Sequence, residues 1–262
     1  MDKSTGSLAE VLGLGPREHV ALVGGGGKTS LMLALGRELR ASGKRVVAST
    51  TTKIWRREAF NLPLVLLRGR EAAWMSTVEE TLEARGHLFL GQEILDSGKV
   101  KGIMPAVLDG IFRDLEVDFI IAEADGSAGH PVKAHEEHEP VIAGSSTRVV
   151  AVMGLEALGR PAGPDLIFRA ERFYRLTGAG DGEPLTPSLL AGLFLNPGGI
   201  FKGSPDSAER IPFLNKADLL AHAEEALALA SLLHKGPGEG IRRVVIGSLR
   251  AGRYRAVLPE ND

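Results

Sequence analysis

A glycine-rich segment followed by lysine and threonine is the part of this sequence best suited to binding phosphate. It comprises, in order, Gly24, Gly25, Gly26, Gly27, Lys28, Thr29 and Ser30. The apolar strand pattern Val20–Val23 precedes it and a helical pattern follows. Glycines adopt positive φ at no steric cost, so successive N–H groups can turn toward one point, where the helix N-terminus adds about half a positive charge. Here Lys28 would neutralise the β- and γ-phosphates and Thr29 would bind Mg²⁺.

The spacing differs from the standard loop G-x-x-x-x-G-K-[ST], which would place glycine where Leu22 stands. This loop is G-x-x-G-K-T, a shorter form that Mur-type peptide ligases also carry. The alternative interpretation is a glycine-rich turn between strand and helix with a chance Lys-Thr pair. The coincidence of strand, glycines, Lys-Thr and helix favours the phosphate loop.

A second polar segment, Ala48–Ile54, follows the next predicted strand. Ligands in open α/β sheets lie beyond the carboxyl ends of the strands. We therefore predict that Thr52 helps to complete the ligand shell of Mg²⁺ and that Lys53 reaches a phosphate. The alternative is β-branched strand residues leading into an exposed turn.

Two acidic residues follow a third apolar strand pattern, Phe119–Ala122. Glu123 and Asp125 resemble the acidic end of a Walker B strand, which holds Mg²⁺ directly or through water. Because they are two residues apart on an extended segment, we expect both carboxylates to point the same way. They would share one ion, or one of them would orient the attacking water. The alternative is a solvated Glu and a turn Asp before Gly126.

Three of the seven histidines, His130, His135 and His138, lie within nine positions among three glutamates. Imidazole and carboxylate together suit a transition metal. The spacing differs from the H-E-x-x-H helix motif, whose histidines are four residues apart. We favour a polar loop bordering the phosphate site, with Lys133 facing phosphate, and leave open whether these histidines bind a metal.

The tetrapeptide Asn215–Asp218 has the form N-K-x-D, the guanine-reading element of P-loop GTPases. It follows an apolar strand pattern and precedes a helical one, as that role requires. The set of predicted base-binding residues is Asn215, Lys216 and Asp218. The D-x-x-G switch motif of GTPases is missing, because Ala128 stands three residues after Asp125.

The composition suits a globular chain of 262 residues with 44% hydrophobic and 24% charged residues. The net charge of −2 does not favour nucleic-acid binding, and the absence of cysteine excludes disulfides and thiolate metal sites. Neither an apolar leader nor a run of 18 apolar residues occurs. We expect a cytoplasmic protein without membrane or nucleic-acid partners.

Short apolar runs alternate with helical patterns, which predicts an α/β fold of three layers: a mostly parallel sheet with helices on both faces, as in P-loop NTPases. The predicted strands are Val20–Val23, Arg45–Ser49, Leu64–Leu67, Phe119–Ala122, Val149–Met153, Ile211–Leu214 and Val244–Ile246. The predicted helices are Ser30–Ser42, Glu71–Ala84, Pro105–Asp114, Pro187–Leu195 and Leu219–His234. We expect one nucleotide-binding domain over residues 1–262, with long surface loops near 154–165 and 196–205.

The sequence resembles the selenium-dependent molybdenum hydroxylase accessory proteins, also described as selenium cofactor biosynthesis proteins. The matching segments are Val23–Thr29, Ser49–Ile54, Ala122–Ser127, Pro131–Ile142 and Asn215–Asp218. Two positions depart from the family pattern, since His135 and Ala143 stand where prolines are usual. The resemblance implies a nucleotide-dependent helper in the maturation of a molybdenum hydroxylase or its cofactor.

The leading hypothesis is a Mg²⁺-dependent P-loop nucleoside triphosphatase that binds GTP, with Lys28, Glu123 and Asp125 as catalytic residues and Thr29, Glu123 and Asp125 as metal ligands. A first alternative is an ATP-dependent kinase or ligase that acts through the γ-phosphate. A second is a nucleotide- or cofactor-binding chaperone without enzymatic activity.

Overall fold

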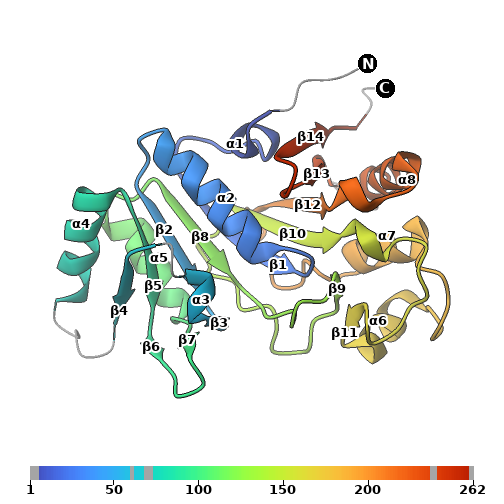
Figure 1. Cartoon of the computed structure of the whole chain (residues 1–262), viewed down its shortest axis with the longest axis horizontal. Helices are drawn as coiled ribbons and strands as arrows, with labels where there is room; N and C mark the ends of the chain where they lie inside the picture. Colours follow the sequence, from blue (N-terminus) through green and yellow to red (C-terminus); the bar gives the residue numbers. More distant parts are fainter. Residues whose placement is uncertain (1–5, 60–61, 68–72, 237–240, 260–262) are drawn as a thin grey trace.

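The centre of the structure is a nine-stranded sheet (Figure 1). Its strand order is β14-β13-β12-β10-β1-β8-β2-β5-β4. The structure is a computed structural model that describes residues 6–59, 62–67, 73–236 and 241–259. Only the pair β13–β14 is antiparallel; the other neighbours in the sheet are parallel. The strands are β1 (Glu18–Gly24), β2 (Val46–Thr50), β4 (Leu64–Leu66), β5 (His87–Gly91), β8 (Phe119–Glu123), β10 (Arg148–Gly154), β12 (Glu209–Asn215), β13 (Val244–Ser248) and β14 (Arg253–Val257).

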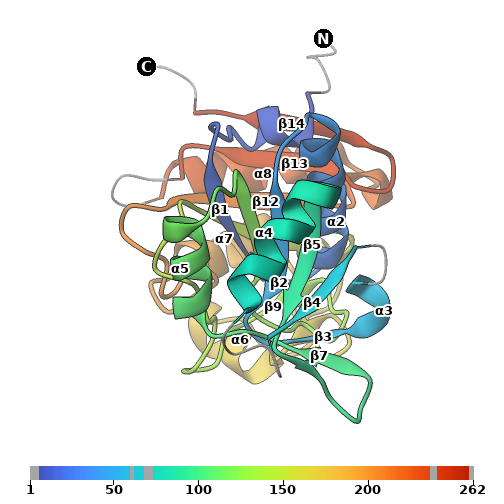
Figure 2. The ribbon, with the colours of Figure 1, turned by 90° about the vertical axis from the view of Figure 1, so that its left-hand side faces the viewer.

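Helices cover both faces of this sheet. The short α1 (Leu8–Val11) and α2 (Lys28–Ala41) pack on one face, whereas α4 (Trp74–Arg85), α5 (Pro105–Asp114), α6 (Ala170–Thr177), α7 (Pro187–Leu195) and α8 (Ala223–His234) belong to the cores of the other. Side chains along a strand alternate between the two faces. In β2, for example, Val46 and Ala48 pack with α2, and Val47 packs with α4 and α5. Figure 2 shows α2 and α5 on opposite sides of the strands. The predicted three-layer α/β class is confirmed.

Two small sheets lie outside the main one. In the first, β3 (Lys53–Trp55) pairs antiparallel with β7 (Lys99–Lys101), which also pairs with β6 (Glu93–Ile94). In the second, β9 (Val132–Lys133) pairs with β11 (Ile167–Phe168). The short α3 (Arg56–Ala59) follows β3 directly.

The seven predicted strands and five predicted helices are all present, with shifts at their ends. The predicted helix Leu219–His234 begins later, at Ala223, because a 3₁₀ turn (Ala217–Leu219) comes first. The start of the predicted helix at Glu71 lies outside the described residues. The sequence patterns did not predict β5, which is an interior strand of the main sheet. They also did not predict α6, β14 or the two small sheets.

Pro212 lies in β12, an interior strand, even though proline cannot donate to a ladder. It lies opposite Ala151 of β10. The ladder from β12 to β13 involves Phe213 and Leu214, so Pro212 falls outside that pairing. Its missing donor is therefore tolerated at this position.

The two expected long loops contribute to the core. Leu155, Ala157 and Ala162 in the first, and Ile200 and Phe201 in the second, are buried against α7 and neighbouring elements. These segments therefore pack inward as well as lying at the surface. No helix among the described residues has both the length and the apolar composition needed to span a membrane.

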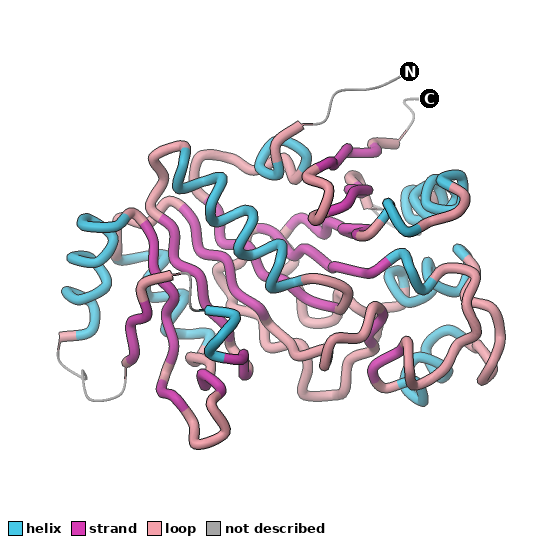
Figure 3. Tube along the Cα trace, viewed as in Figure 1, coloured by secondary structure: helices cyan, strands magenta, loops and turns pink. Residues whose placement is uncertain are grey.

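The loops that follow the central strands meet at one edge of the sheet (Figure 3). This follows from the parallel arrangement of β1, β2, β8, β10 and β12, whose carboxyl ends all face the same way. The glycine loop, Thr52, Glu123 and Asn215 all lie at this edge, where the fold class binds ligands.

Candidate functional site

Three positions of the glycine loop have a positive φ, which favours glycine. Gly24 has a φ of 92°, Gly26 a φ of 74° and Gly27 a φ of 131°. A Cβ on Gly26 would lie 2.2 Å from the backbone nitrogen of Gly154, and one on Gly27 would lie 2.6 Å from Asn215 Nδ2. Glycine is therefore required here by the close approach of the Gly154 backbone and the Asn215 side chain as well as by the φ angles.

Three amides of this loop are bonded within the protein. Gly24 donates to Asp125 Oδ2 at 2.8 Å, Gly25 to the carbonyl of Val152 at 2.9 Å and Gly26 to the carbonyl of His130 at 2.9 Å. The amides available to a ligand are consequently those where α2 begins, from Gly27 to Ser30, because the first turn of a helix has no internal acceptors for them. Gly27 to Ser30 all line a cavity, and the helix dipole favours an anion there.

Lys28 is held beneath the loop by two contacts. Its Nζ lies 3.0 Å from Asp125 Oδ1 and donates to the carbonyl of Gly24, and the residue is 4% exposed. It also lines the cavity, so it lies between a buried carboxylate and the space that would receive phosphate.

Asp125 is the centre of a buried charge cluster. His135 Nε2 lies 2.5 Å and Lys133 Nζ 3.6 Å from its Oδ2, and all three side chains are fully buried. Lys133 also pairs with Glu139 Oε1 at 3.0 Å. Burial alone would raise the pKa of the Asp125 carboxyl, but Lys28, the hydrogen bond from His135 and Lys133 outweigh it and hold that pKa well below its usual range. Burial lowers the pKa of Lys133, and the carboxylates of Asp125 and Glu139 oppose this.

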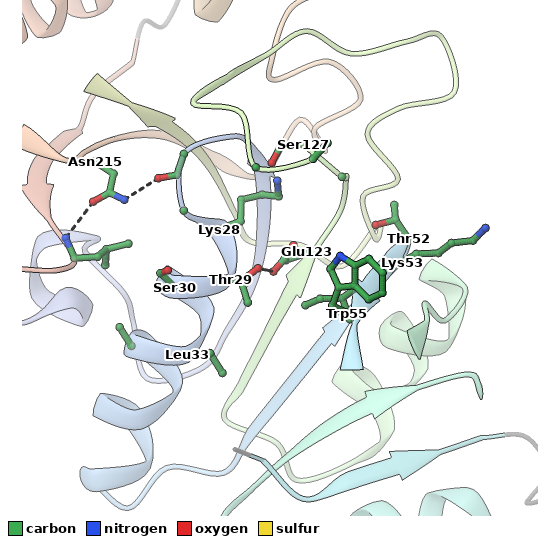
Figure 4. A pocket seen from close by; sticks show the side chains of 18 of the residues that line it. Lys28, Thr29, Ser30, Leu33, Thr52, Lys53, Trp55, Glu123, Ser127 and Asn215 are labelled. Atoms are coloured by element: carbon green, nitrogen blue, oxygen red, sulfur yellow. Dashed lines mark hydrogen bonds between the residues drawn. The ribbon is translucent and has the colours of Figure 1, made fainter. Parts of the chain in front are cut away.

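The expected pair of acidic metal ligands is separated by this arrangement. Glu123 lines the cavity and accepts a hydrogen bond of 2.6 Å from Thr29 Oγ1 (Figure 4). Asp125 instead contacts the buried cations under the loop and is not among the described residues that line the cavity. The reason is that β8 ends at Glu123, so strand alternation no longer governs Asp125. The geometry therefore supports Thr29 and Glu123 as metal ligands and does not support a shared ion.

Thr29 and Glu123 fit a magnesium ion by their chemistry. A hydroxyl and a carboxylate in hydrogen-bond contact supply two hard oxygen ligands beside the helix N-terminus. Mg²⁺ is usually held by one or two such groups, with phosphate and water completing its octahedron. Among the described residues no group of three or more His, Asp or Glu side chains is arranged to hold a metal.

Thr52 and Lys53 line the same cavity. The turn before them is bonded to the end of β8, because Thr50 Oγ1 donates to the carbonyl of Glu123 at 3.1 Å and the Thr51 amide donates to the same carbonyl at 2.9 Å. Thr51 Oγ1 also donates to the carbonyl of Val141 at 2.7 Å. Thr52 and Lys53 are thus carried by a fixed turn beside Glu123.

Asn215 joins three loops of the site. Its Nδ2 donates to the carbonyl of Gly26 at 2.8 Å, and its Oδ1 accepts from the amide of Leu249 at 3.0 Å (Figure 4). Lys216 has a φ of 63° and pairs with Glu156, while Asp218 is exposed and lines the cavity. Asn215 therefore supports the glycine loop. All three of Asn215, Lys216 and Asp218 line the cavity, and Asp218 is the exposed carboxylate among them.

The three histidines lie in different surroundings. The ring nitrogens of His130 contact the carbonyls of Ser127 and Pro164, His135 is buried against Asp125, and His138 lines the cavity. They do not form a metal site within the part of the chain that the structure describes. Lys133, expected to face phosphate, instead contacts Asp125, Glu139 and the carbonyl of Gly126.

The cavity has a volume of about 1940 Å³ and a strongly basic lining. Among the described residues, the lysines and arginines that line it are Lys28, Arg37, Arg40, Lys53, Arg57, Lys99, Lys101, Arg169, Lys216 and Arg250. The acidic residues that line it are Glu123, Glu139 and Asp218. The sequence motifs pointed to only three of these cations, Lys28, Lys53 and Lys216. The others are dispersed along the chain, so no local motif marks them.

Comparisons with known proteins give one family and several distant structures. Residues 20–171 match the model of a family described as YqeC protein. The chain is 33% identical over 245 residues to the uncharacterized protein YqeC of Escherichia coli (strain K12), covering 92% of this chain and 93% of that protein. Chloroplast FtsY from Physcomitrella patens aligns with a TM-score of 0.42 and 11% identity, over 92% of this chain and 62% of that one. The signal recognition particle 54 kDa protein from Aeropyrum pernix K1, solved in complex with GDP, aligns with a TM-score of 0.38 and 17% identity, over 93% of this chain and 44% of that one.

Proposed function

We propose that this chain, which belongs to the YqeC protein family, binds and hydrolyses a magnesium nucleoside triphosphate at the carboxyl edge of its sheet. One observation carries the proposal. The contact of 2.6 Å between Thr29 and Glu123 lies beside the amides that begin α2, in a basic cavity. Metal ligands and phosphate donors are thus available within one site.

The phosphates are assigned to the first turn of α2. The amides from Gly27 to Ser30 and the Lys28 ammonium supply donors and positive charge there. Asp125 holds Lys28 in place without ligand, and a triphosphate would compete with this carboxylate for the same cation. Lys28 is therefore the residue whose partner changes on binding.

Thr29 and Glu123 would hold Mg²⁺, which neutralises charge that develops on the phosphate oxygens during transfer. Thr52 lines the same cavity and would extend this set through water. Asp125 has a different role in the proposal: it positions Lys28 and the amide of Gly24.

The base is assigned to the flank that Asn215, Asp218 and Leu249 line. Asp218 is exposed to the cavity, and a carboxylate there can accept from both N1–H and the N2 amine of guanine. Leu249, whose amide donates to Asn215 Oδ1, offers apolar surface to a ring on this side. We infer that GTP is the preferred nucleotide.

A role as helper in the maturation of a molybdenum hydroxylase or its cofactor, in the cytoplasm, is the biological setting that we propose. The sequence resemblance supports the role in maturation, and the composition supports the cytoplasmic location.

Titration of the purified chain with GTP, ATP and CTP by calorimetry, with and without Mg²⁺, tests the nucleotide site. We expect GTP to bind most tightly and Mg²⁺ to be required for release of inorganic phosphate. Absence of binding by all three nucleotides would overturn the proposal. Binding without phosphate release would remove hydrolysis and leave a nucleotide-binding chaperone, whereas release only with an added acceptor would indicate a kinase or ligase.

A further inference from the structure

We propose that the cavity holds a second ligand beside the nucleotide: an anionic molecule with a planar aromatic ring, bound on the ribbon formed by β3 and β7. This inference deepens the proposed function, on which it rests for the position of the nucleotide. It assigns a ligand class to the flank of the site that the nucleotide does not need.

The size of the cavity is the first observation. Pockets for single small molecules measure about 300–1,000 Å³, whereas this cavity measures about 1940 Å³. The nucleotide is assigned to the first turn of α2 and to the Asn215 flank. The remaining volume extends past Glu123 to the ribbon, and Figure 4 shows Glu123 between the Asn215 side and the Trp55 side of the pocket.

The register of the ribbon is the second observation. Lys53 lies opposite Lys101, and Trp55 lies opposite Lys99. Residues directly opposite each other in an antiparallel pair share a face, and so do residues two apart on one strand. All four side chains therefore belong to one face of the ribbon, and all four residues line the cavity. The central pair, Ile54 and Val100, is buried in the core on the other face.

The chemistry of this face is the third observation. Trp55 is 41% exposed, and Lys99 Nζ lies 4.6 Å from the centroid of its ring. Arg57 lies 5.4 Å from the same centroid, measured at Cζ. Both cations lie over the indole ring. This face suits a ligand that has an aromatic ring and negative charge, because its charge would pair with these cations while its ring packs on the exposed part of the indole.

Charge balance on the ribbon supports an anion. Lys101 pairs with Glu93 at 3.2 Å, and no carboxylate contact of Lys53 or Lys99 is found among the described residues. A neutral or cationic ring would leave this concentration of positive charge uncompensated.

Flavin mononucleotide and riboflavin make a matched pair of probes, since both carry the same fluorescent ring and only the first has a phosphate. The chain contains two tryptophans, so Trp74→Phe leaves Trp55 as the single reporter. Binding is measured by tryptophan quenching and flavin anisotropy in the presence of saturating GDP and Mg²⁺. We expect flavin mononucleotide to bind alongside GDP and riboflavin to bind at least tenfold more weakly.

Variants then locate the site. We expect Trp55→Ala to weaken flavin mononucleotide at least fivefold, measured by anisotropy, while the Kd for GDP stays unchanged. The double variant Lys99→Ala/Lys101→Ala should weaken it similarly, and Lys44→Ala/Lys235→Ala, which removes two lysines outside the cavity lining, should not.

Four results would each overturn the proposal of a second site. They are failure of flavin mononucleotide to bind, equal binding of both probes, displacement of flavin mononucleotide by GDP, and an unchanged affinity for flavin mononucleotide in Trp55→Ala. If the chain binds no nucleotide but binds the probe in a Trp55-dependent manner, the proposed function fails and the ribbon site stands.

Discussion

The Nζ of Lys28 lies 3.0 Å from Oδ1 of Asp125, beneath the glycine loop and nearly shielded from water. Lys133 and His135 approach the other oxygen of the same carboxylate. The lysine that would bind phosphate is thereby held by a carboxylate that also bonds the loop backbone at Gly24. Loop geometry and lysine position consequently depend on one buried residue.

Lys28→Ala should reduce the affinity for triphosphate more than tenfold, because a charge-assisted contact is worth about 1.5–3 kcal/mol. Lys133→Ala is the matched control, since it also removes a cation from Asp125 but does not line the cavity. It should lower Tm with little effect on affinity. Calorimetry and thermal unfolding measure both, and equal nucleotide affinities in the two variants would refute the phosphate role of Lys28.

Asp125→Asn should lower the free energy of unfolding at pH 7 by about 3–5 kcal/mol, because it leaves buried cations without their counter-charge. Since the folded pKa of Asp125 is depressed, its contribution is present above the unfolded pKa near 3.8 and is lost as the pH falls below it. Urea unfolding at pH 7 measures this loss. Asp114→Asn, in an exposed pair with Arg113, should leave the free energy of unfolding nearly unchanged, because exposed ion pairs contribute little. Similar values for the two variants would contradict the central role of Asp125.

Glu123→Gln should raise the Mg²⁺ concentration needed for half-maximal turnover about tenfold or more. The amide keeps the shape of the side chain but loses the charge that attracts the ion. Nucleotide binding without metal should change much less, which calorimetry in chelator can establish. An unchanged Mg²⁺ dependence would remove Glu123 from the metal site; Glu116→Gln, at the other end of the sheet, serves as control.

Asp218→Asn should weaken GTP and strengthen xanthosine triphosphate, because the O2 of xanthine accepts from the new amide. Sites built on such hydrogen bonds discriminate by up to ~10⁴-fold. Asp218 is exposed, so the effect here should be smaller. Competition of GTP, ATP and CTP against a fluorescent nucleotide is the readout. Equal affinities in the wild-type chain would be incompatible with guanine recognition and would leave the phosphate site intact.

Acid should destabilise the chain through His19. Burial lowers the pKa of His19 to about 4, partly opposed by Asp109, so the ring is neutral when folded and its Nδ1 contacts Ser145 Oγ at 2.8 Å. The unfolded chain binds this proton first, so stability is complete above pH 6.5 and falls by about 3 kcal/mol as the pH drops to 4. His19→Asn should flatten this part of the curve of unfolding free energy against pH. The exposed His222→Asn should leave it unchanged, and a wild-type slope in His19→Asn would exclude His19 as the cause.

Local patterns in the sequence were sufficient for much of the fold and for the start of the site. The apolar run before Gly24, the glycines and the amphipathic helix after Lys28 specify a strand, a turn and a helix through short-range backbone preferences. The parallel arrangement then follows from alternating strands and helices, which explains why Thr52, Glu123 and Asn215 lie at one edge of the sheet.

Tertiary structure alone decided the partners of Asp125 and the face of the ribbon. Strand alternation predicted that Asp125 would point with Glu123, but β8 ends at Glu123, and the chain returns to place Lys133 and His135 against Asp125. Likewise β3 and β7 have three residues each and are paired across more than forty positions, so neither has a pattern long enough to detect. Burial and long-range pairing determine these contacts, and both depend on segments that meet only when the chain has folded.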